Sequence, residues 1–185
     1  MRYDPEKHHR RSIRLAGYDY SQAGAYFVTV CTQNRQCLFG DIVEGEMRLN
    51  EYGRVVAECW AWLGRQYQHV DLDGWVVMPN HLHGVIMIDD VGRGGSRTAP
   101  TDMAKHKPLG RLIGAFKTVS TKQINILRGV SGAPVWQRNY YEHVIRGGDQ
   151  LDRIRRYIED NPRMWEMDRE NPAAQNTGGE ESWLV

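Results

Sequence analysis

Alternating apolar and polar positions mark several stretches of this chain as strands. Residues 25–32 are rich in β-branched and aromatic side chains, and a period of two places Tyr26, Val28 and Val30 on one face of a first strand. Residues 37–50 alternate around a Glu-Gly-Glu sequence, which predicts a short hairpin. Residues 75–77 precede a bend at Pro79 and Asn80, after which a central strand continues to residue 88, and residues 135–145 predict another strand.

Apolar residues at helical spacing mark three helices, at residues 51–67, from residue 109 onwards, and at residues 149–161. Asn50 is a plausible N-cap for the first helix, and Pro162 disfavours the α conformation for the residue before it, so the third helix ends there. The apolar positions are Val55, Val56, Cys59, Trp62 and Leu63 in the first helix, Leu109, Leu112, Ile113, Phe116 and Val119 in the second, and Leu151, Ile154 and Ile158 in the third.

The order of these elements predicts the fold class. A βαβ unit followed by helix, strand and helix is the order of an α+β, ferredoxin-like sandwich, with helices packed on a mostly antiparallel sheet. We expect a basic N-terminal arm at 1–21, one folded domain at 22–165 and a polar, acidic tail at 166–185. The glycine-rich stretch 89–108 predicts a flexible loop within the domain.

Composition excludes several classes of protein. The chain is 41% apolar and 25% charged, and no apolar run approaches the roughly 20 residues that span a bilayer, so we expect neither a membrane helix nor a secretory signal. Cys31, Cys37 and Cys59 are odd in number and lack the close pairing of a zinc or redox motif. We therefore expect a cytoplasmic protein with reduced thiols and no membrane partner.

The net charge of +1 conceals an uneven distribution of basic residues. Seven Lys and Arg residues and no Asp or Glu lie between residues 103 and 141, and the N-terminal arm is also basic. Such a pattern suits phosphate contacts of a nucleic acid, although a solvated helix face explains it equally well. The DNA-binding candidates are Arg10, Arg11, Arg14, Arg111, Lys117, Lys122 and Arg138.

A His-hydrophobic-His sequence provides the first candidate for chemistry. His81 and His83 flank Leu82, and in a strand the two imidazoles point to the same face and can share a metal ion. Two neutral imidazoles bind a divalent cation weakly, so a third ligand must come from elsewhere in the chain. A half-buried histidine pair bonded to its neighbours is the alternative interpretation.

A tyrosine on the third helix provides the second candidate. Tyr157 lies on the flank of the apolar stripe, in line with Arg153 and Asn161, and residues four apart on a helix lie one above the other. The Tyr157 hydroxyl and the Asn161 amide can therefore converge on one ion. A tyrosine at the rim of the core explains the same position, and Tyr140 and Tyr141 compete for the role of nucleophile.

The histidine pair resembles the motif of the HUH endonucleases, and the chain is similar to the single-tyrosine transposases of that class, in particular the REP-associated tyrosine transposase family. The similar stretches lie within residues 10–165 and follow one another in the family's order. They are Arg11-Ser12-Ile13-Arg14-Leu15, Gly24-Ala25-Tyr26-Phe27-Val28-Thr29, Val77-Met78-Pro79-Asn80-His81-Leu82-His83, Val135-Trp136-Gln137-Arg138-Asn139-Tyr140-Tyr141-Glu142-His143 and Arg156-Tyr157-Ile158-Glu159-Asp160-Asn161-Pro162.

This resemblance implies a DNA transposase that cleaves and joins single-stranded or hairpin-forming repeat DNA. By position, Tyr157 is the nucleophile that forms a 5′-phosphotyrosine, and Asn161 joins His81 and His83 at a Mg²⁺ or Mn²⁺ ion, although histidines could also hold Zn²⁺ or Ni²⁺. The wider class includes obligate dimers, so a homodimer or a monomer is expected. Candidates for active-site support are Gln137, His143 and Arg153.

Two other functions are compatible with these residues. The fold could serve a hairpin-DNA-binding housekeeping protein with reduced or no transposition. A metal-dependent phosphoesterase with water as nucleophile would need more carboxylates near the histidines than the sequence offers. A covalent adduct between protein and DNA would distinguish the transposase from the phosphoesterase.

Overall fold

The computed structural model describes residues 18–89 and 107–174. Its strands are β1 (Gly24–Cys31), β2 (Gly40–Val43), β3 (Glu46–Leu49), β4 (Val70–Val77), β5 (His81–Ile88) and β6 (Tyr141–Ile145). Its helices are α1 (Glu51–Gln66), α2 (Leu109–Leu127) and α3 (Gly148–Asp160), with the short 3-10 turns η1 (Gln33–Arg35) and η2 (Trp165–Met167).

Four strands form one antiparallel sheet in the order β4-β5-β1-β6, while β2 and β3 form a separate hairpin. β1 is a central strand, as expected, and it pairs with β5 along its whole length, from Gly24 opposite Ile88 to Cys31 opposite His81. Because side chains alternate along a strand, this register decides which residues of β1 and β5 share a face.

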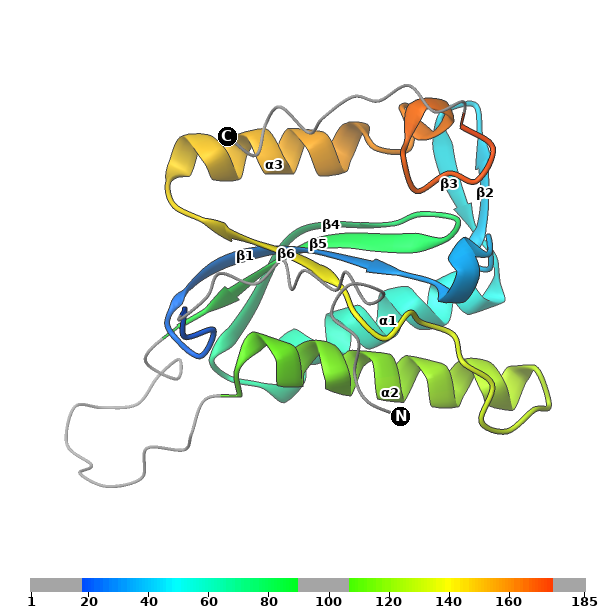
Figure 1. Ribbon diagram of the computed structural model, residues 1–185, viewed down its shortest axis with the longest axis horizontal. Coiled ribbons are helices and arrows are strands. Elements are labelled where there is room, and N and C mark those ends of the chain that lie inside the picture. The colour runs from blue at the N-terminus through cyan, green and yellow to red at the C-terminus, as the bar shows by residue number, and fades with distance from the viewer. Residues whose placement is uncertain (1–17, 90–106, 175–185) are drawn as a thin grey trace, which may run out of the picture.

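Helices cover both faces of the sheet (Figure 1). α1 and α2 pack on one face, where Tyr26, Val28 and Val30 meet residues such as Trp60 and Phe116 in the larger core. α3 packs on the other face through Ile154 and Ile158, which contact a smaller core that includes Phe27 and Val85. The expected α+β sandwich is confirmed, with α3 alone covering the second face among the helices of the described residues.

Local chemistry explains the turns that lead into α1. Glu44 and Gly45 have φ values of 54° and 76°, and a tight two-residue hairpin turn requires positive φ at both positions. The side chain of Asn50 then accepts a hydrogen bond of 3.0 Å from the backbone N–H of Gly53, which satisfies a free donor in the first turn of α1. The expected hairpin and the expected N-cap are both confirmed.

The strand predicted at residues 135–145 is shorter in the structure. Trp136 makes an isolated bridge to Thr32, and regular pairing with β1 begins only at Tyr141. Between them, the Lys117 ammonium of α2 donates to the backbone carbonyls of Gln137 and Asn139, at 2.9 and 2.8 Å. Those carbonyls are turned towards α2 and do not join the sheet, which is why the strand is interrupted.

Parts of the predicted domain plan lie outside the described residues. These are residues 1–17 with Arg10, Arg11 and Arg14, residues 90–106 of the expected loop, and residues 175–185 of the expected tail. Residues 166–174 of the expected tail are described, and residues 161–165 separate them from the end of α3. In the described ranges, no helix combines the length and the apolar character needed to cross a membrane.

Candidate metal centre and nucleophile

β5 places His81 and His83 on the sheet face that α3 covers. They pair with Cys31 and Thr29 of β1. These two residues lie on the same face of β1 as Phe27, which belongs to the smaller core. The two imidazole rings lie 4.4 Å apart between centroids, and their residues are 0% and 2% exposed. The sequence therefore predicted correctly that both histidines share one face, and both are buried on it.

Asn80 fixes the tautomer of His81. The Asn80 amide donates to the backbone carbonyls of Arg35 and Glu170, at 3.1 and 2.6 Å, so its oxygen must point the other way. That oxygen lies 2.8 Å from Nδ1 of His81, which must therefore carry the proton. Nε2 of His81 is left with a free lone pair, as a metal ligand requires.

His83 is held by neighbours on both sides of its ring. Its Nδ1 lies 2.8 Å from the hydroxyl of Thr29, and its ring stacks on Phe27 with centroids 5.4 Å apart. Burial lowers the pKa of His81 to about 3 and holds the pKa of His83 well below its ordinary value. Both imidazoles are therefore neutral at physiological pH, which is the state that binds metals.

Asp168 is a third ligand-type residue at this site, and the sequence did not single it out. Its Oδ2 lies 3.8 Å from Nε2 of His81, and the three ligand atoms of His81, His83 and Asp168 lie within 4.8 Å of one another. The Asp168 side chain is 5% exposed, and burial raises the pKa of its carboxyl. A carboxylate therefore faces the histidine pair from beyond the end of α3.

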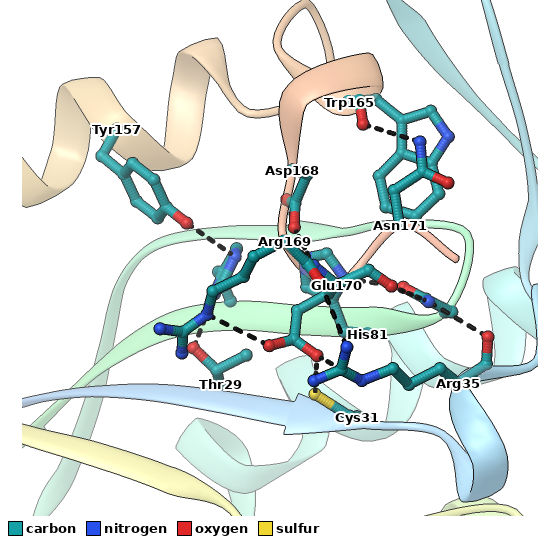
Figure 2. A network of polar contacts seen from close by, with 12 residues as sticks. Thr29, Cys31, Arg35, His81, Tyr157, Trp165, Asp168, Arg169, Glu170 and Asn171 are labelled. Carbon is teal, nitrogen blue, oxygen red and sulfur yellow. Dashed lines mark hydrogen bonds and ion pairs between the residues drawn. The ribbon is translucent and has the colours of Figure 1, made fainter. Parts of the chain in front are cut away.

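The segment that carries Asp168 is anchored to the sheet end by a polar network (Figure 2). Oδ1 of Asp168 accepts from the backbone N–H of Glu170 at 2.6 Å, which aims Oδ2 at the histidines. Glu170 is 6% exposed and forms ion pairs with Arg35 at 3.1 Å and with Arg169 at 3.2 Å. These contacts, together with the Asn80 bond to the Glu170 carbonyl, hold the segment against η1 and the end of β1.

Asn161, the ligand expected from helical spacing, lies at the same site. It is the C-cap of α3 and is 3% exposed. Its side chain opposes the larger effect of burial on both groups, because it raises the pKa of His81 and lowers the pKa of Asp168. The structure thus places two candidates for the third ligand, Asn161 and Asp168, beside the histidine pair.

The donor atoms fit a divalent cation. Nε2 of His81, Oδ1 of Asn161 and Oδ2 of Asp168 are buried and lack a hydrogen-bond partner within the described residues. Buried polar atoms are normally paired, because an unpaired one costs about 1–3 kcal/mol. These three atoms are all acceptors, and a cation would satisfy all of them at once. Mixed imidazole and oxygen donors suit Mn²⁺, and less closely Mg²⁺.

Tyr157 of α3 brings a nucleophilic group to this cluster. Its hydroxyl lies 3.3 Å from Nε2 of His83, and its ring meets Phe27 edge-on with centroids 6.0 Å apart. Figure 2 shows Tyr157 reaching from its helix towards the polar network. Of the competing tyrosines, Tyr140 packs in the core on the opposite face of the sheet, and Tyr141 packs against Phe27 on the same face. The hydroxyl placed beside His83 is that of Tyr157.

The other predicted residues fall in two groups. His143 of β6 bonds Gln150 in the first turn of α3 at 2.8 Å, and Arg153 is exposed on α3, so both lie along that helix. Gln137, Lys122 and Arg138 line a groove beside α2, on the opposite face of the sheet. Arg111 is exposed on α2. The DNA candidates of α2 are therefore separated from the metal centre by the sheet.

Comparison with known proteins identifies one relative by sequence and one solved structure with a similar fold. It is 38% identical over 175 residues to an uncharacterised protein of Haemophilus influenzae, covering 91% of this chain and 96% of that protein. A solved structure of the REP-associated tyrosine transposase bound to a REP hairpin has a similar fold, with a TM-score of 0.52 at 18% identity over 82% of this chain and 73% of the other. No protein-family model matches the chain. The chain belongs to the family of the Haemophilus influenzae protein and shares the fold of the REP-associated tyrosine transposase.

Proposed function

We propose that the protein is a metal-dependent DNA strand transferase that cleaves and rejoins single-stranded, hairpin-forming DNA through Tyr157. The observation that carries this proposal is the 3.3 Å approach of the Tyr157 hydroxyl to His83 within a buried cluster of metal-ligand atoms. The solved structure with a similar fold is bound to a REP hairpin, which supports hairpin DNA as the substrate class.

The reaction proposed is a transesterification at phosphorus. The Tyr157 oxygen forms a bond to the scissile phosphorus and its proton leaves to solvent, while the bond from phosphorus to the 3′-oxygen breaks and that oxygen takes up a proton from solvent. The products are a 5′-phosphotyrosine and a free 3′-hydroxyl, and attack by another 3′-hydroxyl reverses the step and joins two strands. A divalent ion held by His81, His83 and an oxygen of Asn161 or Asp168 would neutralise the phosphate and stabilise the leaving oxygen.

The surrounding residues prepare the site for this step. Asn80 and Thr29 orient the two imidazoles, and burial keeps both neutral. α3 presents Tyr157 to the same face of the sheet. Because the histidines and the tyrosine come together within one chain, we expect a single chain to be catalytically competent, without a residue from a partner.

The test is to trap a covalent adduct. A labelled hairpin-bearing oligonucleotide incubated with Mn²⁺ should give a species of protein and DNA that survives denaturant, and a chelator should prevent it. Tyr157→Phe removes only the attacking oxygen, so the adduct should vanish while folding and DNA binding persist. Tyr140→Phe and Tyr141→Phe are the matched controls and should still form it. An adduct that persists in Tyr157→Phe would move the nucleophile to another residue.

One observation favours a second function, a phosphoesterase with water as nucleophile. Asp168 supplies a carboxylate beside the histidines, so the expectation that the sequence offers too few carboxylates there was wrong for this residue. A carboxylate at this position could take a proton from water. Strand cleavage without any adduct, retained in Tyr157→Phe and abolished in Asp168→Ala, would establish this alternative.

A further inference from the structure

We propose that the groove between the C-terminal half of α2 and the loop that follows it binds an unpaired stretch of the DNA strand, on the sheet face opposite the metal centre. This inference rests on the proposed function, because it takes DNA as the ligand. The groove has a volume of about 780 Å³ and is lined by residues of α2 and of the segment 130–138. It is separate from the histidines, which lie on the α3 side of the sheet.

The charge of the groove suits a polyanion. Lys122 and Arg138 are basic residues of its lining, and none of the described residues that line it is acidic. Lys117 also lines the groove, but its ammonium donates to the carbonyls of Gln137 and Asn139. Lys117 therefore ties the loop to α2, while Lys122 and Arg138 are available for phosphate oxygens.

A buried amide in the groove indicates a ligand with hydrogen-bond donors. Asn125 lines the groove and is 6% exposed, and its Nδ2 donates to the carbonyl of Ala133 at 2.8 Å. Its Oδ1 is buried and has no partner in the described part of the chain. The exocyclic amines of adenine, cytosine and guanine, and the ring N–H groups of guanine and thymine, are donors that could reach such an oxygen.

Apolar side chains at the same place favour an unpaired strand over a duplex. Ile126 and Val130 line the groove and are 68% and 47% exposed, which is unusual for residues of this type. The flat face of an unpaired base could cover them, whereas a duplex keeps its base faces stacked inside. Phosphates on Lys122 and Arg138 and a base over Ile126 would use the charged, polar and apolar groups of the groove together.

The groove is connected to the metal centre through the end of β1. The backbone N–H of Gln137, in the groove lining, donates to the carbonyl of Cys31 at 2.9 Å. The Cys31 thiol lies 3.4 Å from Oε2 of Glu170, in the segment that carries Asp168. The groove lining and the segment that carries Asp168 therefore both contact the same end of β1. A strand that holds its scissile phosphate at the metal centre would pass this end of the sheet to reach the groove.

The test measures binding of a labelled, unstructured single-stranded oligonucleotide to the full chain in a chelator, where no cleavage occurs. Lys122→Gln with Arg138→Gln should lower the salt slope of the affinity by about 1.4, because each neutralised phosphate of a single strand contributes about 0.7 to the slope. Arg48→Gln with Arg65→Gln removes the same charge from exposed positions outside the groove and should leave the slope unchanged. Equal slopes for the two double variants would overturn the proposal.

A second measurement isolates the base. An abasic position scanned along the oligonucleotide should weaken binding by the wild-type protein at the position held in the groove, because the base no longer covers the apolar side chains there. In the Ile126→Ala variant, an abasic nucleotide at that position should no longer weaken binding. If no abasic position weakens binding by the wild-type protein, the proposed base contact is overturned. Tighter binding of duplex DNA, or of RNA of the same sequence, would overturn the assignment to an unpaired DNA strand. The adduct assay tests the proposed function separately. If the wild-type protein forms no adduct but the groove variants still change DNA binding as expected, only the proposed function is refuted.

Discussion

The carboxylate of Asp168 lies 3.8 Å from Nε2 of His81, and the two side chains are 5% and 0% exposed. Neither the imidazole nitrogen nor the facing carboxylate oxygen has a hydrogen-bond partner in the described residues. The His81 nitrogen carries a lone pair, because Asn80 fixes the proton on the other nitrogen. Two buried acceptors therefore face each other, an arrangement that costs stability unless a cation joins them.

This pair leads to a prediction about Asp168→Asn. Without metal, the variant should be more stable than the wild type by about 1 kcal/mol, because an amide can donate to His81 where a carboxylate cannot. With metal, the order should reverse: an ion present at about 100 times its dissociation constant stabilises the wild type by about 2.7 kcal/mol, and the variant should gain less. Thermal unfolding with and without Mn²⁺ measures both effects.

Glu166→Gln is the matched control, because Glu166 is an exposed carboxylate two residues earlier. It should behave as the wild type in both conditions. If Asp168→Asn gained as much from Mn²⁺ as the wild type does, Asp168 would not be a ligand, and Asn161 would remain the third ligand candidate.

The histidines themselves should separate cleavage from binding. His81→Ala or His83→Ala removes a ligand that faces the metal centre, so cleavage should be abolished. Hairpin binding should stay within a few-fold of the wild type, because phosphate contacts from exposed basic residues provide most of the affinity. Gel-shift and cleavage assays on the same preparations measure the two effects, and a parallel loss of both would show that the histidines also hold DNA.

Much of the candidate metal centre could be predicted from the sequence, because its residues lie in pairs that are only two or four positions apart along the chain. His81 and His83 share a face by strand alternation, and Tyr157 and Asn161 share a face by helical spacing. The periodicity of residues 51–67 likewise predicted α1 almost to its last residue, Gln66. In each of these cases, residues a few positions apart determine the geometry.

Contacts between distant segments could not be predicted in this way. Asp168 lies in a polar stretch without periodicity, which is typical of a solvated tail, and only the turns after Asn161 bring it back to His81. The interruption before β6 depends on Lys117, which is remote in sequence and donates to the carbonyls of Gln137 and Asn139. The period of an element indicates which of its residues are buried, but not which distant segment covers them.

A glycine beside His83 should prove essential for the packing of β5. A Cβ at Gly84 would lie 2.5 Å from the ring of Trp60, which is fully buried, so Gly84→Ala should destabilise the fold by about 1–3 kcal/mol. Gly114→Ala on α2 is the control: a Cβ there meets nothing within 4 Å, and alanine is the better helix former by about 1 kcal/mol. Urea unfolding should therefore shift in opposite directions for the two variants, and shifts of equal sign would contradict this account.

The N-terminal residues, which lie outside the described ranges, give a prediction from sequence alone. Removing residues 1–11 deletes Arg2, Lys7, Arg10 and Arg11, each a candidate phosphate contact. Hairpin binding should weaken, and the salt slope should fall by about 0.7–0.9 for each phosphate that is no longer neutralised. Fluorescence anisotropy over a salt series measures the slope, and an unchanged slope would show that this arm does not touch DNA.

The last prediction concerns the ion pair that holds α3, and with it Tyr157, against the sheet. Arg155 contacts both carboxylate oxygens of Asp73 in β4, at 2.8 and 2.7 Å, where the β4–β5 register shifts between Leu72 and Trp75. Hydrogen bonding to Arg155 lowers the pKa of Asp73. A lowered carboxyl pKa stabilises the fold at pH values above the unfolded pKa of about 3.9, and this stabilisation disappears as the pH falls through the folded pKa.

Asp73→Asn should therefore unfold at a lower temperature than the wild type at pH 7, and the difference should vanish in acid. The variant should also form the Tyr157 adduct more slowly at saturating DNA while its DNA affinity is unchanged, because α3 is held less firmly over His83. Asp152→Asn is the control: Asp152 also contacts Arg155, at 2.9 Å, but lies on α3 itself and cannot tie the helix to the sheet. A difference that persists at low pH, or an equal loss of rate in Asp152→Asn, would show that the pair does not position Tyr157.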